Sequence, residues 1–363
     1  MSSVVHCART GELGKMSLLD ATEHLFDAAG FADCITPGDI VAVKLHFGER
    51  GNTAFVPPIF VRRIVEKVKN CGGKPFLTDS NTLYRGSRAN AVDHTVTAIE
   101  NGFGYATVGA PIVIADGMSG KEYVEVRVDG THFEAVKIGA AVVHADALIA
   151  VTHFKGHEAT GFGGVMKNLG MGLGARSGKQ MMHADFRPVV DASKCTACGE
   201  CADWCPVDAI AVGDVATTDH GICIGCGECV VTCPYSAIAV DWSTDAAKMQ
   251  EKVAEYVKGA LAGKEGKIGC FNFLLNITPD CDCWHFSGAP FVPDIGILAS
   301  KDPVAIDRAS VDLVSEAPAL VGSLAGHVGD KFHALTGVDG TPILDYASGL
   351  RLGSVNYSMQ YLK

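Results

Sequence analysis

The chain has 363 residues, 48 % of them apolar and 20 % charged, with 42 glycines, 14 cysteines and a net charge of −11 at pH 7. This composition excludes a disordered or fibrous protein, and the length allows roughly two domains. The acidic charge argues against nucleic acid or an anionic membrane surface as a main partner. No apolar run reaches the length of a membrane span, and residues 1–20 do not resemble a secretory signal, so a cytoplasmic location is expected.

Short apolar runs that end in polar residues predict buried parallel strands at 40–47, 75–79, 111–116 and 147–153. Helices are predicted between them at 58–70 and 91–101, and alternation at 123–128 predicts an edge or hairpin strand. A helix is predicted at 245–261, strands at 267–273 and 294–299, and a last helix capped by Asp302 with Pro303 at its first position. This order predicts an α/β fold with a mostly parallel sheet and helices on both faces.

The second half of the chain carries a cysteine-rich duplication. Eight of the 14 cysteines lie between Cys195 and Cys233. They form the unit Cys-x2-Cys-x2-Cys-x3-Cys-Pro twice, once from Cys195 and again from Cys223. The duplication predicts a small ferredoxin-like module over 188–243 that is inserted into one α/β domain, whose two parts are 1–187 and 244–363.

Each unit offers three closely spaced thiolates to one 4Fe–4S cluster, and its fourth cysteine belongs to the other cluster. The spacing predicts one cluster on Cys195, Cys198, Cys201 and Cys233, and a second on Cys223, Cys226, Cys229 and Cys205. Two zinc sites are the alternative, but zinc usually requires two Cys-x2-Cys or Cys-x2-His pairs per site, and these quartets fit that poorly. The module resembles a bacterial two-cluster ferredoxin, which implies two low-potential clusters close enough to exchange an electron.

Negative charge is concentrated in the same module. Between residues 189 and 241, eight acids stand against one base, Lys194. This imbalance predicts an electron donor or acceptor protein that docks through a basic patch, at a rate that salt lowers. The alternative is that the acids only solvate the face of a small module.

Polar residues gather where three of the predicted strands end. Lys44 and His46 are two residues apart and point the same way, within the run 44–52. The run 79–88 follows a second strand, and the run 153–170, with His, Lys, Asn and Gly, follows a third. Open α/β sheets bind ligands at such strand ends, so a pocket for a small anionic ligand is predicted here. Glycine-rich loops with merely exposed polar side chains are the alternative.

Four motifs extend a resemblance over nearly the whole chain: Lys-x-His-Phe-Gly-Glu from Lys44, Asp-x-Asn-Thr-Leu-Tyr from Asp79, Lys-Gly-His with Lys-Asn from Lys155, and the run from Ile277 to Cys283. They are similar to the ferredoxin-bearing branch of the domain-of-unknown-function 362 family. The resemblance implies a shared pocket, which consists of Lys44, His46, Glu49, Asp79, Thr82, Tyr84, Lys155, His157, Lys167 and Asn168. The stretch from His157 to Lys167 is also similar to the nickel-pincer lactate racemases, which hold His and Lys beside a phosphorylated cofactor.

Two further patterns remain open. The stretch from Gly174 to Lys179 is one residue short of a phosphate-binding P-loop and predicts no nucleotide site. Cys281 and Cys283 follow a predicted strand, and with His285 or a pocket histidine they could enclose a metal ion, although free thiols are the commoner outcome.

Three functions are consistent with these patterns. The first is a reductase that passes single electrons from an external donor through two 4Fe–4S clusters to an anionic substrate or cofactor in the α/β pocket. Lys44, Lys155 and Lys167 then hold the anionic group, and His46 or His157 supplies protons. The alternatives are a non-catalytic electron carrier between protein partners, and a cluster-based redox sensor or assembly factor.

Overall fold

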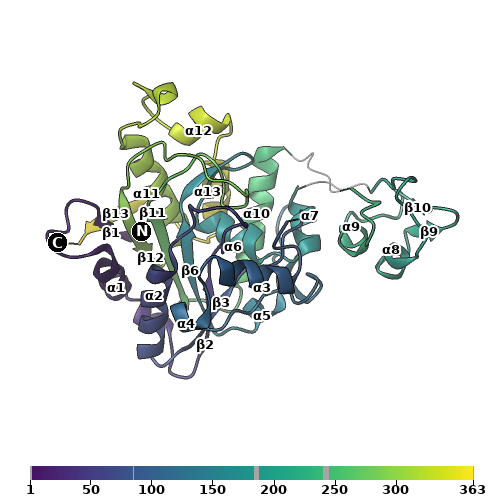
Figure 1. Ribbon diagram of the computed structural model, residues 1–363, viewed down its shortest axis with the longest axis horizontal. Coiled ribbons are helices and arrows are strands. Elements are labelled where there is room, and N and C mark those ends of the chain that lie inside the picture. The colour runs from purple at the N-terminus through teal and green to yellow at the C-terminus, as the bar shows by residue number, and fades with distance from the viewer. Residues whose placement is uncertain (1, 85, 184–187, 240–244, 363) are drawn as a thin grey trace.

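The computed structural model describes residues 2–84, 86–183, 188–239 and 245–362. Within these residues the central element is a seven-stranded sheet (Figure 1), in the order β13 (Tyr357–Tyr361), β1 (Ser3–Arg9), β12 (Gly296–Ser300), β11 (Ile268–Leu274), β6 (Ala147–His153), β2 (Ile40–Lys44) and β3 (Lys74–Thr78). β11, β6, β2 and β3 are parallel, and β12 runs antiparallel to both of its neighbours. The predicted α/β fold with a mostly parallel sheet is confirmed.

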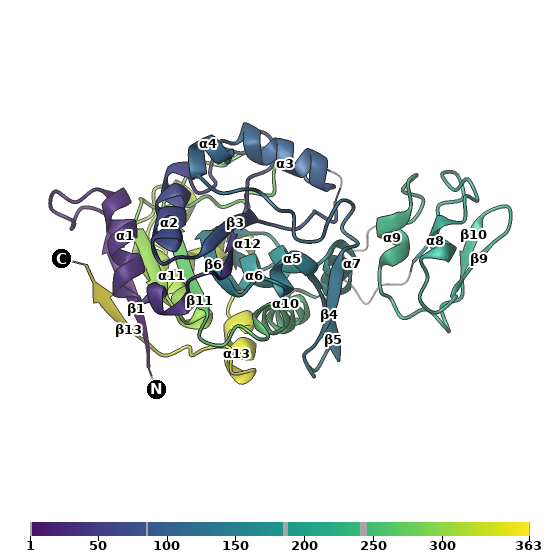
Figure 2. The same cartoon turned by 90° about the horizontal axis from the view of Figure 1, so that it is seen from below.

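Helices cover both faces of this sheet (Figure 2). One face is covered by α1 (Leu18–Ala28), α2 (Pro58–Asn70), α3 (Ala91–Glu100) and α4 (Tyr105–Val108). The other is covered by α6 (Val165–Leu173), α10 (Ala246–Leu261), α11 (Pro303–Glu316) and α13 (Pro342–Gly349). None of the helices in the described ranges has the length and apolarity that crossing a membrane requires.

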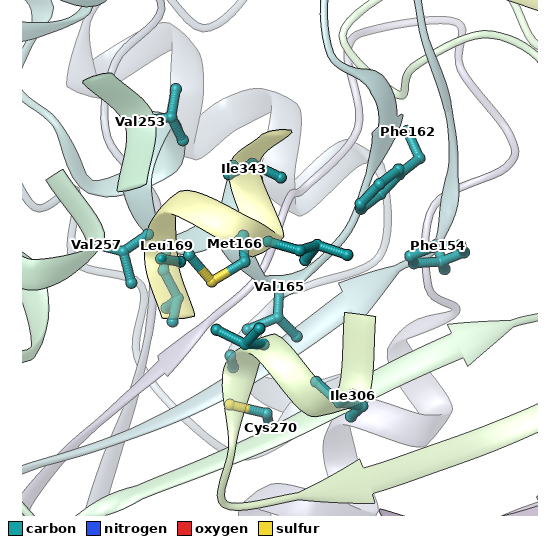
Figure 3. Close-up of a cluster of buried hydrophobic side chains, with 14 of the residues drawn as sticks. Phe154, Phe162, Val165, Met166, Leu169, Val253, Val257, Cys270, Ile306 and Ile343 are labelled. Atoms are coloured by element: carbon teal, nitrogen blue, oxygen red, sulfur yellow. The ribbon is translucent and has the colours of Figure 1, made fainter. Parts of the chain in front are cut away.

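Alternate residues of the central strands supply the two hydrophobic cores. Ile149 of β6 packs with the α1 and α2 side, whereas Leu148 packs with the α6 and α10 side. Figure 3 shows part of this second core, where Leu169 of α6 lies near Val253 and Val257 of α10. Because helices cover β6 on both sides, all seven of its residues are buried, which explains the unbroken apolar run in the sequence.

The helix signals in the sequence correspond to real helix ends. Pro58 begins α2, and the helix buries Val61, Ile64, Val65 and Val68, which form one helical stripe. Asp302 caps α11, since its carboxylate accepts hydrogen bonds from the backbone N–H groups of Val304 and Ala305 at 2.9 and 2.8 Å. The alternating segment at 123–128 forms β4 (Tyr123–Arg127), which pairs in a hairpin with β5 (Ala135–Gly139).

One predicted strand is wrong. The segment 111–116 forms no strand and makes a single parallel bridge, between Ile112 and Leu77 of β3. The Pro111 carbonyl accepts from the N–H of Leu77 at 2.8 Å, and the Val113 N–H donates to the Leu77 carbonyl at 2.9 Å. Beyond this bridge the Val113 carbonyl accepts from the Thr78 hydroxyl at 2.7 Å, and on the other side Pro111 has no N–H to donate, so the segment lies along β3 without forming a regular strand.

The cysteine-rich segment 188–239 has a small core of its own. It contains α8 (Glu200–Asp203), α9 (Glu228–Thr232) and a hairpin of β9 (Ile210–Val212) with β10 (Ala216–Thr218). Its core consists of Cys201, Ile210, Ala216, Cys229 and Ile238. The predicted boundaries after residues 187 and 243 coincide with 184–187 and 240–244, which are outside the described residues. α9 lies on the side of this segment that faces the sheet domain, and α8 lies farther away (Figure 2).

Candidate functional site

A cavity of about 890 Å³ opens at the carboxyl ends of the parallel strands. Lys44 ends β2, Asp79 follows β3, and Lys155 lies two residues beyond β6. The strand register sets Lys44 level with Thr78 and Ala150, so the residues that follow these strands are neighbours in space. All ten pocket residues expected from the sequence line this cavity: Lys44, His46, Glu49, Asp79, Thr82, Tyr84, Lys155, His157, Lys167 and Asn168.

Lys44 connects three elements in the floor of the cavity. Its Nζ donates to Oδ1 of Asn168 on α6 at 2.6 Å and lies 3.0 Å from Oδ1 of Asp79. The Asn168 amide in turn donates to Oγ1 of Thr152 at 2.9 Å, which fixes its orientation. Burial lowers the pKa of Lys44, although the nearby Asp79 carboxylate favours its charged form.

Arg88 holds a second side of the cavity. It ends the polar run 79–88 but was not among the ten pocket residues expected from the sequence. Its guanidinium lies 3.2 Å from Oε2 of Glu49 and 3.6 Å from Oδ2 of Asp79, and it donates to the Tyr84 hydroxyl at 2.5 Å. Tyr84 donates onward to the backbone carbonyl of Cys283 at 3.1 Å. The side chain of Arg88 is 2 % exposed, so these bonds fix it as part of the wall.

Lys155 is anchored by a buried carboxylate. Its Nζ lies 3.3 Å from Oδ2 of Asp282 and donates to the His153 carbonyl at 2.9 Å. Nδ1 of His153 lies 2.8 Å from the other oxygen of Asp282. Burial opposes ionisation of Asp282, but His153 and Lys155 outweigh it and lower the pKa of this carboxyl. The three groups hold the 281–283 segment against the end of β6.

Two thiols lie at the same wall. Nζ of Lys167 is 3.5 Å from Sγ of Cys281, and ligand atoms of His157, Cys281 and Cys283 all lie within 4.8 Å of one another. The hydrogen bond from Cys283 and the charges of Lys167 and Lys155 hold the pKa of Cys281 well below its usual value. The pKa of Cys283 is raised by that same hydrogen bond and by burial. The two pKa shifts have opposite directions, so Cys281 is the more acidic thiol of the pair.

Positive charge predominates on the cavity wall. Among the described side chains that line it, five are cationic and three are carboxylates, namely Lys44, Arg88, Lys155, Lys167 and Lys179 against Glu49, Asp79 and Glu158. Burial lowers the pKa of Lys179 to about 8. His46 is different, because burial lowers its pKa well below its usual value and its Nδ1 accepts from the N–H of Gly48 at 3.0 Å. Because Nδ1 accepts this hydrogen bond, the neutral form of the His46 ring carries its proton on Nε2.

The eight clustered cysteines surround two separate small cavities. One is lined by Cys195, Cys198, Cys201 and Cys233, and the other by Cys205, Cys223, Cys226 and Cys229. Backbone N–H groups donate to three of these sulfurs, from Ala216 to Cys195, from Ala209 to Cys205 and from Ala237 to Cys233, at 3.2–3.3 Å. We call these groups the outer and the inner quartet, because the inner one includes Cys229 of α9 on the side facing the sheet domain. Four sulfurs around one cavity and N–H donors to sulfur suit a metal centre with thiolate ligands.

The inner quartet packs against α7 (Arg176–His183). A Cβ at Gly227, beside Cys226, would lie 2.7 Å from Cβ of Gln180, so this glycine allows close contact with the helix. Glu228 reaches across to the sheet domain, where Lys137 Nζ lies 2.7 Å from its carboxylate and the Tyr123 hydroxyl donates to it at 2.9 Å. Lys179 and His183 of the same helix line the 890 Å³ cavity. One helix therefore touches both the inner quartet and the cavity.

Comparison with models of known protein families shows the family of this chain. The model of a domain of unknown function, DUF362, matches residues 41–312. The chain belongs to the DUF362 family. The match spans both the cavity residues and the cysteine-rich segment, and the comparison with curated proteins found no match.

Solved structures resemble this DUF362 chain only distantly. The lactate racemase apoprotein from Thermoanaerobacterium thermosaccharolyticum is 13 % identical, with a TM-score of 0.46, over 87 % of this chain and 58 % of that one. A structural-genomics protein from Thermotoga maritima is 10 % identical, with a TM-score of 0.37, over 70 % of this chain and 49 % of that one. The chain thus spans about half the length of these proteins.

Sequence reasoning missed several cavity residues of this DUF362 chain. Lys179 lies in a stretch that was set aside as an incomplete P-loop, and it reaches the cavity from α7. Lys179 and His183 are four residues apart, the spacing of one helix face, and this signal could have found both. Cys283 and His285, which the sequence offered as possible metal ligands, line the cavity, whereas Cys270 is buried in the core on β11.

Proposed function

We propose that this protein is an iron–sulfur reductase in which 188–243 forms the module that holds two 4Fe–4S clusters. The outer quartet holds one cluster and the inner quartet the other. The repeated cysteine spacing and the grouping of the same cysteines around two cavities support this assignment. When bound, such clusters supply single electrons over a range of about −700 to +450 mV.

The observation that carries the proposal is the position of α7. Gly227 of the inner quartet loop packs on Gln180, and Lys179 of the same helix lines the cavity. The outer quartet, the inner quartet, α7 and the cavity follow one another in that order. An α-helix with its side chains is about 10 Å wide, so the inner quartet and a cavity ligand are separated by little more than one helix.

The cavity suits an anionic substrate. Lys44, Lys155 and Lys167 converge on it from β2, from the end of β6 and from α6, and cations outnumber carboxylates on its wall. Neutral His46 presents an N–H that can bind a carbonyl or carboxylate oxygen of the substrate. Burial lowers the pKa of Lys179, whose Nζ donates to the Gly174 carbonyl at 2.6 Å, so this lysine gives up its proton more easily than an exposed lysine does. These residues bind and orient the substrate and supply the protons that a reduction consumes.

The test is a single-turnover reoxidation of the full chain, with its clusters assembled and then reduced anaerobically by dithionite. The deproteinised small-molecule fraction of a cell extract is added, and reoxidation is followed by visible absorption. We expect wild type and the exposed-lysine control Lys301→Ala to be reoxidised, and Lys155→Ala to be at least about tenfold slower with the same iron and sulfide content. A reoxidation rate of Lys155→Ala equal to that of wild type contradicts the assignment of the cavity as the substrate site.

The second candidate is a carrier that relays electrons between proteins. It is favoured by exposed acids in the cysteine-rich segment, namely Glu200, Asp203, Asp208, Asp214 and Asp219, which can dock a basic partner. A carrier is reoxidised by the protein fraction of the extract and not by its small molecules. The same experiment therefore distinguishes the two functions.

A further inference from the structure

The wall of the cavity brings together three side chains from two distant segments. β7 (Lys155–His157) lies against the loop around residue 279, where the N–H of Gly156 donates to the Thr278 carbonyl at 2.8 Å. A Cβ at Gly156 would lie 2.0 Å from the Pro279 carbonyl oxygen, so only glycine permits this approach. The contact brings His157 next to Cys281 and Cys283, with all three ligand atoms within 4.8 Å of one another.

We propose that His157, Cys281 and Cys283 bind one divalent transition-metal ion of the zinc class. Two sulfurs and one imidazole nitrogen are the donor set that such ions prefer. Three protein ligands leave a fourth position open, and His157 and Cys283 both line the 890 Å³ cavity. An open fourth position on a cavity is typical of catalytic metal sites, whereas structural sites have four protein ligands. The ligand at that position is a water molecule or an oxygen of an anionic substrate.

The ligand loop is fixed on both sides of the two sulfurs. The carbonyl of Asp282 accepts from the N–H of Glu49 at 2.9 Å, and the carbonyl of Cys283 accepts from Tyr84. The Asp282 side chain is bound by His153 and Lys155. Such outer contacts orient metal ligands before an ion binds.

Charge at the site is balanced once an ion binds. A divalent ion with two thiolates and a neutral imidazole carries no net charge, and Nζ of Lys167, 3.5 Å from Cys281, can donate to the bound sulfur. Nδ1 of His157 accepts from the N–H of Ala159 at 3.1 Å. An ion bound at Nε2 requires the ring proton to move to Nδ1, so the Ala159 N–H must turn away from Nδ1 to another acceptor.

This site is separate from the two cysteine quartets and does not depend on the proposed reductase activity. Its cysteines lie at 281 and 283, outside the repeated units, and its histidine belongs to the sheet domain. Assembly of the 4Fe–4S clusters and occupancy of this site can therefore be measured one by one.

The first experiment measures cysteine alkylation by iodoacetamide in the full-length wild-type chain, peptide by peptide, with and without Zn²⁺. We expect Zn²⁺ to slow alkylation of Cys281 and Cys283 by about tenfold or more, because coordination occupies the reactive sulfur. Cys71, a half-buried thiol outside the cavity, is expected to react at the same rate in both cases. Equal rates at Cys281 and Cys283 with and without Zn²⁺ overturn the proposal, whether or not the clusters assemble.

The second experiment measures Co²⁺ binding to the cluster-loaded chain. We expect wild type and Cys71→Ser to bind one Co²⁺ beyond the cluster iron, with thiolate-to-cobalt absorption, and Cys283→Ser and His157→Ala to lose it. Cluster iron and sulfide content serves as the folding control for each variant. Unchanged Co²⁺ binding in folded Cys283→Ser and His157→Ala contradicts the assigned ligands.

Discussion

His94 on α3 is a buried base directly behind the cavity. Within the described residues neither of its ring nitrogens has a hydrogen-bond partner, and the ring packs edge-on against Phe47. Nε2 lies 3.9 Å from Oδ2 of Asp79, which favours the charged ring, while the positive charges of Arg88, Lys179 and Lys44 oppose it. Burial is the largest effect and lowers the pKa of His94 to about 3. The folded protein therefore keeps this ring neutral.

Acid should weaken the fold through His94. The unfolded chain binds the proton near pH 6.5 and the folded chain only near pH 3, so stability is lost as the pH falls below about 6.5. Between about pH 7.5 and 5.5, we expect His94 to account for about 1.4 kcal/mol of the decrease in the free energy of unfolding. Urea unfolding at the two pH values measures it, and His94→Phe should lose that much less than wild type. An equal loss in both proteins contradicts the neutral, buried ring.

Among the individual residues of the cavity, those close to strand ends can be predicted from the sequence, whereas those that come from other elements cannot. Lys44, Asp79 and Lys155 follow from the rule that parallel strands end at one edge, since that rule needs only local patterns. Lys179 depends on where α7 packs, and packing is determined by contacts between distant parts of the chain. The sequence offered His285 or a pocket histidine as the partner of Cys281 and Cys283. The close approach at Gly156 selects His157, and a single glycine does not reveal that choice.

Among the elements, α7 and α9 form the contact between the cysteine-rich segment and the sheet domain. Gly227 and Gly199 are equivalent positions of the duplication, both with positive φ, at +74° and +86°. A Cβ at Gly227 meets Gln180, whereas a Cβ at Gly199 meets nothing within 4 Å. The duplication could be read from the sequence, but which copy faces the sheet domain could not, because both copies carry the same glycine.

A comparison of the variants Gly227→Ala and Gly199→Ala distinguishes the effect of packing on α7 from the effect of backbone strain. Both variants adopt a left-handed backbone that costs alanine about 1 kcal/mol, but only Gly227→Ala adds an overlap with α7, which typically costs about 1–3 kcal/mol more. We expect faster amide hydrogen exchange in α7 for Gly227→Ala and wild-type exchange for Gly199→Ala. Identical exchange in the two variants argues against direct packing of α9 on α7.

For the molecule as a whole, negative charge is unevenly distributed over the surface of the cysteine-rich segment. Its exposed acids include Glu200 and Asp203 on α8, while Glu228 is buried in the contact with Lys137. For the proposed electron transfer, we expect a positively charged donor to be attracted to the side near the outer quartet. The sequence revealed the surplus of acids, but not that Glu228 is removed from the surface.

Reduction by a cationic donor should depend on salt. We expect the methyl viologen radical cation to reduce the chain with its assembled clusters more slowly as ionic strength rises. Salt screens the electrostatic attraction between the cation and the acidic side chains. Glu200→Gln with Asp203→Asn should lower the rate at low salt, whereas Glu265→Gln, an exposed acid near the start of β11, should not. A rate independent of salt in all three proteins is inconsistent with docking on α8.

The most direct test of the two-cluster assignment is the iron and acid-labile sulfide content of the anaerobically purified chain. We expect about eight iron and eight sulfide per chain, and about half of each in Cys229→Ser and in Cys233→Ser. These two variants should lose different clusters, since Cys229 lines the inner cavity and Cys233 the outer one. Two zinc ions per chain without sulfide would show that the quartets hold zinc and not 4Fe–4S clusters.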